Sequence, residues 1–380
     1  MIYFDNSATT KPFQEVIDSF VKVSSEYYAN PSSLHGFGGQ AEKLLSQARA
    51  QAAKLLSVKN SEIIFTSGGT EGNNLAVKGT ASFYKNRGNH LITTEIEHPS
   101  VREPFKQLEN RGFDVTYIPV DANGRVNAGD IERAIRPDTI LVSVMHVNNE
   151  VGTIQPIKEI GELLQNYPKI IFHVDHVQGM GKVPLPLYQN HIDLCTISAH
   201  KIHGLKGMGI LYIREGVQLE PILSGGNQEG KLRSGTENVA GAVSMAKALR
   251  LITEKMEHKK EHLSNISKTL RNRLKNLDGV VVNTPDQIAA PHILNISIPH
   301  MKSEVVVHAL EDKDIYVSTT SACSSKQKTV SSTLTAMGVS KEIAGSAIRL
   351  SLSYDNTLEE VEKVIAAIAE TVAALRKVMK

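Results

Sequence analysis

The chain has 380 residues, of which 41% are hydrophobic and 22% charged, as in an ordinary soluble globular protein. Its 42 basic residues nearly balance its 40 acidic ones, and no dense basic tract indicates binding to nucleic acid or a membrane surface. No stretch approaches the ~18 apolar residues of a spanning helix, and no signal-peptide pattern follows Met1. One core stops growing at roughly 250–300 residues, so two domains are expected.

Along the first two thirds of the chain, helix-like and strand-like segments alternate. Two helices are expected at 12–28, with Pro12 in the first turn, and at 40–58. Strand-like runs follow at 62–67, 90–94, 114–120, 139–147, 170–175, 194–198 and 209–214. Helices are expected between the first five of these strands, near 75–85, 100–112, 131–135 and 157–167. Apolar strands separated by helices indicate parallel pairing with helices on both faces of the sheet.

The last third has a different pattern. Residues 239–277 are expected to form a long, broken helix, and short strands and two helices follow it. These strands lie at 280–283, 293–298 and 349–353, and the helices at 304–313 and 358–378. We therefore predict a large α/β domain at 14–255, with a mainly parallel sheet flanked by helices, and a small α+β domain made of 1–13 and 256–380.

Lys201 follows the apolar run Leu194–Ser198, at the place where that strand should end. Ligands of open α/β sheets lie at the carboxyl ends of strands. A desolvated amine in such a place has a lowered pKa and can condense with an aldehyde to form a Schiff base. The alternative is a solvated lysine in a glycine-rich loop.

A second candidate feature is the segment SGGTEGNN, which places Gly68, Gly69 and Thr70 between a strand and a helix. Glycines and a helix N-terminus can hold a phosphate, although a glycine-rich turn is the alternative. The segment lacks the P-loop and dinucleotide fingerprints, so a smaller phosphorylated ligand is expected.

Three more polar residues follow strand-like runs. Asp175 could pair with Lys201 or with a protonated pyridine nitrogen, and Gln178 could reach a neighbouring ring substituent. His98 could cap a helix or stack on a ring. The order of phosphate loop, histidine, aspartate and lysine is that of pyridoxal-phosphate enzymes of the aspartate-aminotransferase fold.

Ten segments in order along the chain resemble the motifs of NifS/IscS-like cysteine desulfurases, class-V members of fold type I. They are YFDNSATT, NPSSLHGFG, TSGGTEGNN, EHPSV, MHVNNEVGTIQP, DHVQ, SAHKIHGLKGMG, GGNQEGKLRSGTEN, SACSS and RLSLS. The resemblance covers nearly the whole chain. It implies pyridoxal phosphate as cofactor, L-cysteine as substrate and a homodimer.

The resemblance also implies a role for each matching residue. Lys201 would carry the cofactor, Asp175 and Gln178 would hold its ring nitrogen and phenolic oxygen, and His98 would stack on it as a catalytic residue. The phosphate side would comprise Gly69, Thr70, Ser198, His200 and the partner subunit's Thr236. Asn149, beside the cofactor, and Arg349 would hold the substrate, although Arg349 could instead form an interdomain ion pair. No metal is expected.

The chain has only two cysteines, which cannot build a disulfide framework and fit a reducing cytoplasm. Cys323 lies in a polar stretch beside lysines, where a thiol can be reactive. The resemblance makes Cys323 the residue that takes sulfur as a persulfide and passes it to an acceptor, either an iron–sulfur scaffold or a tRNA-thiolating enzyme. Cys195 lies in an apolar run and is expected in the core.

Four positions depart from the usual pattern of this family, namely His176, Leu205, Thr320 and Ser353. The changes at Leu205 and Thr320 bear on loop flexibility, so one alternative is a sluggish or partner-dependent enzyme. Two rival functions also remain open: an aminotransferase or selenocysteine lyase of the same fold, and a non-catalytic scaffold for sulfur transfer.

Overall fold

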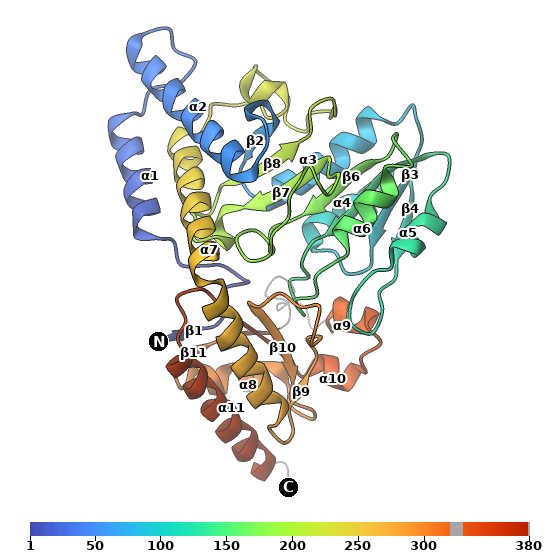
Figure 1. Cartoon of the computed structure of the whole chain (residues 1–380), viewed down its shortest axis with the longest axis vertical. Helices are drawn as coiled ribbons and strands as arrows, with labels where there is room; N and C mark the ends of the chain where they lie inside the picture. Colours follow the sequence, from blue (N-terminus) through green and yellow to red (C-terminus); the bar gives the residue numbers. More distant parts are fainter. Residues whose placement is uncertain (320–329, 379–380) are drawn as a thin grey trace.

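The computed structural model describes residues 1–319 and 330–378 and contains two main sheets joined by one long helix, α7 (Figure 1). The larger sheet has seven strands in the order β2-β8-β7-β6-β5-β3-β4. Their bounds are β2 Ile63–Thr66, β3 His90–Thr94, β4 Asp114–Ile118, β5 Thr139–Met145, β6 Ile171–Asp175, β7 Leu194–Ser198 and β8 Gly209–Ile213. The predicted α/β fold with a mainly parallel sheet is confirmed.

Helices cover both faces of this sheet, and its inner strands are therefore buried on both sides. Neighbouring residues such as Leu141 and Val142 belong to two separate cores, as the alternation of side chains along a strand requires. One core includes α3 (Gly69–Phe83) and α4 (Pro99–Glu109). The opposite core includes α1 (Gln14–Glu26), α2 (Gly36–Leu56), α5 (Ala128–Ala134), α6 (Ile157–Leu164) and α7 (Val239–Lys275).

The structure corrects three expectations. Strand β8 runs antiparallel to both neighbours, because the 199–208 connection from β7 is too short for the crossover that a parallel strand needs. Helix α7 is continuous rather than broken, since no proline or glycine interrupts it past its first turn. Pro12 lies two residues before α1, outside its first turn.

The smaller sheet is antiparallel, with strands in the order β12-β13-β10-β9. Its strands are β9 Val281–Val282, β10 Ile293–Ser297, β12 Ser318–Thr319 and β13 Ala347–Ser351. Helices α8 (Ser303–Glu311) and α11 (Leu358–Val378) pack near it, and α9 (Ser332–Ala336) and α10 (Lys341–Gly345) are two short helices that the sequence pattern missed.

The N-terminal strand β1 (Ile2–Tyr3) pairs in parallel with β11 (Ile315–Tyr316) beside the smaller sheet. The chain then crosses towards the larger sheet, where Thr10 donates to the carbonyl of His200. The domain division, including the grouping of residues 1–13 with the C-terminal part, stays a prediction. Within 1–319 and 330–378, no helix has the length and apolarity to cross a membrane.

Candidate active site

Lys201 lies in the short 3-10 helix η2 (Ala199–Lys201), directly after β7. Its amine donates to the carbonyl oxygens of Ser7 and Ala8, at 2.5 and 2.7 Å. The side chain is therefore held against the N-terminal segment and is partly buried, unlike a lysine that points freely into solvent. The sequence placed Lys201 at a strand end correctly, and the tertiary structure adds the two carbonyls.

Asp175 ends β6, the strand adjacent to β7, and is buried. Its Oδ2 accepts from Asn73 Nδ2 at 2.8 Å and its Oδ1 from the amide of Val177 at 3.0 Å. Burial raises the pKa of Asp175, while these hydrogen bonds and the charge of Lys201 oppose that rise. A carboxylate held in this way can face a protonated ring nitrogen.

His98 is the N-cap of α4, as one of its two predicted roles requires. Its Nδ1 accepts from the amide of Ser100 at 3.1 Å. Burial, and then the charge of Lys201, lowers the pKa of His98 to about 4, so the ring is neutral near pH 7. Because the cap uses the edge of the ring, it is compatible with stacking, which stays a prediction.

One chain of hydrogen bonds joins His98 to Asp175. The hydroxyl of Ser100 contacts His98 Nδ1 at 2.7 Å and accepts from Asn73 Nδ2 at 2.9 Å. Asn73 in turn donates to Asp175. Asn73 of α3 and Ser100 of α4 thus link two site residues that are far apart in sequence.

The glycine-rich segment meets β7 at the predicted phosphate side. Gly68, with φ of 148°, is the N-cap of α3, and Thr70 follows in the first turn. A Cβ on Gly69 would lie 3.0 Å from Val177 Cγ2 and 3.4 Å from Ser198 Cβ. The open N-terminus of α3 and the Ser198 hydroxyl therefore lie close together, which fits a bound phosphate.

His200 lies next to Lys201, and its Nδ1 is 3.3 Å from the hydroxyl of Thr9. Burial, and then the charges of Lys201 and Lys206, lowers its pKa to about 4. A neutral imidazole can donate one hydrogen bond to an anion. The residues present thus fit pyridoxal phosphate, with Lys201 for the aldehyde, Asp175 for the ring and α3 for the phosphate.

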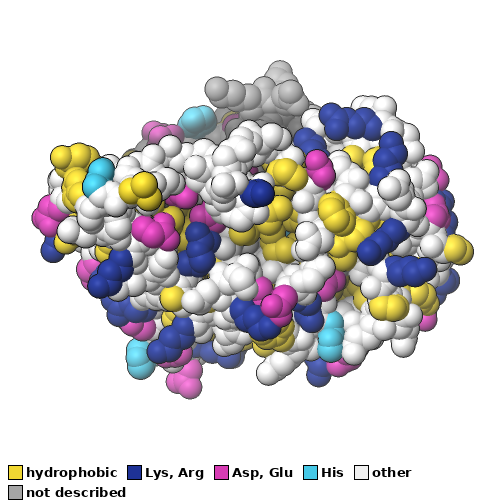
Figure 2. Space-filling view, turned by 90° about the horizontal axis from the view of Figure 1, so that it is seen from above, with side chains coloured by type: hydrophobic (Ala, Val, Ile, Leu, Met, Phe, Trp, Pro, Cys, Tyr) yellow, Lys and Arg dark blue, Asp and Glu magenta, His cyan; other side chains and the backbone are white. Residues whose placement is uncertain are grey.

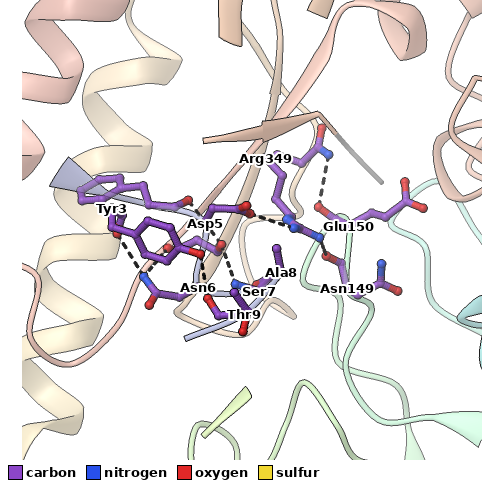
Figure 3. Close-up of polar contacts among 12 residues, drawn as sticks. Tyr3, Asp5, Asn6, Ser7, Ala8, Thr9, Asn149, Glu150 and Arg349 are labelled. Carbon is purple, nitrogen blue, oxygen red and sulfur yellow. Dashed lines mark hydrogen bonds and ion pairs between the residues drawn. The ribbon is translucent and has the colours of Figure 1, made fainter. Parts of the chain in front are cut away.

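Gln178 and Arg349 contact the same N-terminal segment as Lys201, and Arg349 also contacts Asn149. Gln178 Nε2 donates to the carbonyl of Ser7 at 3.0 Å. Arg349, on β13, is buried and donates from Nη1 to the carbonyl of Asn149 at 2.8 Å (Figure 3). Its Nη2 pairs with Asp5 at 3.1 Å, an ion pair within the predicted small domain rather than between the two domains.

Thr236 lies apart from these residues on the exposed surface. It lines a hollow together with the exposed apolar residues Ile222 and Leu223. Figure 2 looks onto the side at the top of Figure 1 and shows hydrophobic side chains gathered in its middle. A role for Thr236 in a partner subunit's site stays a prediction.

Of the two cysteines, Cys195 lies in the part of the chain that the structure describes. Cys195 is fully buried in β7, and burial raises the pKa of its thiol well above the usual value, so its expected place in the core is confirmed. Cys323 and Thr320 lie outside the described residues.

The other departures from the family pattern have structural partners. His176 Nδ1 lies 2.8 Å from His146 Nδ1 in a buried pair, and burial lowers the pKa of both rings. Ser353 forms a turn in which its amide donates to Asn356 Oδ1 at 2.7 Å. Leu205 packs against the main core.

Sequence reasoning missed three contributors to this site: the carbonyls of Ser7 and Ala8, the carboxylate of Asp5, and Asn73. The first two belong to the segment YFDNSATT and Asn73 to TSGGTEGNN. The polar side chains of Asp5 and Asn73 were the available signal, whereas side-chain type does not indicate a role for the backbone carbonyls of Ser7 and Ala8.

The sequence and the overall fold also match known proteins. The aminotransferase class-V family matches residues 2–364. A NifS/IcsS protein homolog of Lactobacillus delbrueckii subsp. bulgaricus is 49% identical, over 97% of this chain and 97% of that protein. The cysteine desulfurase IscS of Dictyoglomus turgidum is 40% identical, over 99% and 96%. A solved structure described as a NifS-like protein superposes with a TM-score of 0.92 at 40% identity, covering 98% of this chain and 99% of that one.

Proposed function

This chain belongs to the aminotransferase class-V family, and we infer from that premise that it is a pyridoxal-phosphate-dependent cysteine desulfurase. It converts L-cysteine to L-alanine and retains the sulfur on the protein. The observation that carries the proposal is the placement of Lys201 and Asp175 at the ends of adjacent strands, beside the open N-terminus of α3.

Each residue of the site has a separate role in binding the cofactor or in the reaction. When bound, pyridoxal phosphate supplies an electron sink for the substrate's Cα. Asp175 keeps the ring nitrogen protonated, Gln178 holds the phenolic oxygen and His98 stacks on the ring. The Lys201 amine holds the cofactor and takes the α-proton. Gly69, Thr70, Ser198 and His200 bind the phosphate.

The substrate is held by Asn149 and Arg349, whose guanidinium fork suits an α-carboxylate. The Cys323 thiolate then attacks the substrate sulfur. A sulfur–sulfur bond forms, the bond between Cβ and sulfur breaks, and its electron pair takes up a proton at Cβ to give alanine. Cys323 retains the persulfide.

The persulfide sulfur passes to an acceptor protein, an iron–sulfur scaffold or a tRNA-thiolating enzyme. We place the enzyme in the cytoplasm because a working thiol needs reducing surroundings. The proposal includes a homodimer in which Thr236 reaches the phosphate bound by the partner subunit. It also includes the domain division at residue 255.

The test is incubation of the purified holoenzyme with L-cysteine and a reductant, without any keto acid. Alanine and sulfide should form in equal amounts. Alanine formation that requires a keto acid would indicate an aminotransferase. Turnover of selenocysteine but not of cysteine would indicate a selenocysteine lyase, and the absence of any turnover would indicate a scaffold.

A further inference from the structure

The guanidinium of Arg349 is only partly satisfied by the residues around it (Figure 3). Nη1 donates to the carbonyl of Asn149 at 2.8 Å and Nη2 pairs with Asp5 Oδ1 at 3.1 Å. Nε is buried and has no hydrogen-bond partner within residues 1–319 and 330–378. A buried donor without a partner is costly, so this nitrogen marks a place where an acceptor belongs.

The two nitrogens Nε and Nη2 form one edge of the guanidinium and point the same way. A carboxylate fits such an edge with both of its oxygens, giving two parallel hydrogen bonds. Asp5 contacts one nitrogen of this edge and leaves the other unpaired. The best carboxylate-binding edge of Arg349 is therefore half-occupied by a carboxylate of the protein itself.

Exposure decides which of the two side chains can move away. The Arg349 side chain is 3% exposed, whereas the Asp5 side chain is 20% exposed. Without a counter-charge, the buried arginine would be strongly unfavourable, so Asp5 compensates it while no ligand is present. Once another carboxylate arrives, Asp5 can turn to solvent and Arg349 cannot.

The backbone around Asp5 is anchored independently of this ion pair. The amide of Ser7 donates to the hydroxyl of Ser351 at 2.8 Å, and Asn6 donates to the carbonyl of Ser351 at 3.0 Å. The carbonyls that hold Lys201 can therefore remain in place when the Asp5 side chain rotates. Displacement of Asp5 is a local side-chain event.

We propose that Asp5 sets the affinity of this site for carboxylates: its own carboxylate occupies half of the Arg349 edge until the α-carboxylate of the amino-acid substrate displaces it. This proposal rests on the proposed function, because it takes Arg349 as the residue that binds the substrate. It explains how a buried arginine stays compensated before binding and still discriminates between ligands with and without a carboxylate.

The test uses the apoprotein and 3-mercaptopropionate, which has the carboxylate and thiol of cysteine but no amine. Calorimetry should show that Asp5→Asn, which keeps an acceptor but loses the charge, binds this ligand about two- to tenfold more tightly than the wild type. Asp5→Glu, whose longer carboxylate can fill the fork, should bind it more weakly. The matched control is Asp314→Asn, an exposed carboxylate that pairs with the N-terminal amine, and it should match the wild type.

The holoenzyme supplies a second readout. Asp5→Asn should lower the KM for L-cysteine and leave unchanged the affinity for cysteamine, which has no carboxylate, measured from the cofactor spectrum. Weaker binding of 3-mercaptopropionate by Asp5→Asn would show that Asp5 merely orients Arg349, and unchanged binding would show that it is not displaced; either result overturns the proposal. A wild type that forms no alanine would instead refute the proposed function, while the apoprotein titration still reports on Asp5.

Discussion

Asn73 Nδ2 lies 2.8 Å from Asp175 Oδ2, and this contact joins the first turns of α3 to the end of β6. Both side chains are buried. A neutral donor beside a buried carboxylate stabilises its charged form, which is the form that Asp175 needs to face a protonated ring.

Replacing Asn73 by alanine should therefore weaken cofactor binding. A hydrogen bond to a charged group contributes roughly 1.5–3 kcal/mol, so the dissociation constant of pyridoxal phosphate should rise about tenfold or more. The measurement is absorbance during dialysis of the holoenzyme. Asn110→Ala, which changes an exposed asparagine, is the control, and an equal loss in both variants would contradict the assigned role.

Lys201→Ala should abolish covalent attachment of the cofactor. The wild type should be yellow, and borohydride should fix the cofactor onto Lys201, because its amine lies at the strand end among the cofactor residues. Peptide mass spectrometry locates the reduced adduct. Lys206→Ala, an exposed lysine in the same loop, should behave as the wild type. A fixed adduct that persists in Lys201→Ala would show that another lysine carries the cofactor.

Cys323→Ser should stop alanine formation and still allow the spectral change that L-cysteine binding causes, since serine lacks the soft sulfur nucleophile. After cysteine treatment, the wild type should gain about 32 Da on Cys323, the mass of one sulfur.

Cys195→Ala should remain active, because that thiol is buried and its raised pKa keeps it protonated. An adduct on Cys195, or undiminished alanine formation by Cys323→Ser, would replace the persulfide route with direct expulsion of sulfur.

The protein should be a homodimer, because the exposed hollow around Thr236 includes Ile222 and Leu223 on a face that otherwise leaves apolar surface in water. Light scattering should give twice the mass of the chain. Thr236→Val should keep the dimer and weaken cofactor binding about tenfold, through loss of one hydrogen bond to phosphate. A fully active monomer would rule out this arrangement.

Glu97 should make the protein less stable as the pH rises. Burial raises its pKa from 4.5 to about 8 in the folded chain. Between these values the folded chain retains a proton that the unfolded chain has lost, so the free energy of unfolding falls with rising pH, by at most about 1.4 kcal/mol per pH unit.

Glu97→Gln should remove this fall, because glutamine still accepts from Thr94 and from the amide of Met145 but carries no charge. Urea unfolding at about pH 5 and about pH 8 measures the free energy of unfolding of both proteins. The variant should be more stable than the wild type only at the higher pH. Glu95→Gln, at an exposed position, is the control. A variant that is equally destabilised at both pH values would show that Glu97 is needed as a carboxylate.

The sequence by itself determined the features that depend on local pattern. Apolar strands alternating with helices predicted the layered α/β fold. Asp175 was placed at a strand end because it closes one run of buried composition, and Lys201 because it comes shortly after another. Cys195 was predicted to lie in the core for the same reason.

The tertiary structure alone decided which distant residues meet. Local periodicity reports which face of an element is buried, and it does not report what that face packs against. The contacts of Ser7 with Lys201, and of Asp5 with Arg349, join the N-terminal segment to residues nearly 200 and over 340 positions away, and β1 reaches its place only by pairing with β11. The direction of β8 was decided by the length of its connection, because a short link cannot return a strand to the same end of the sheet.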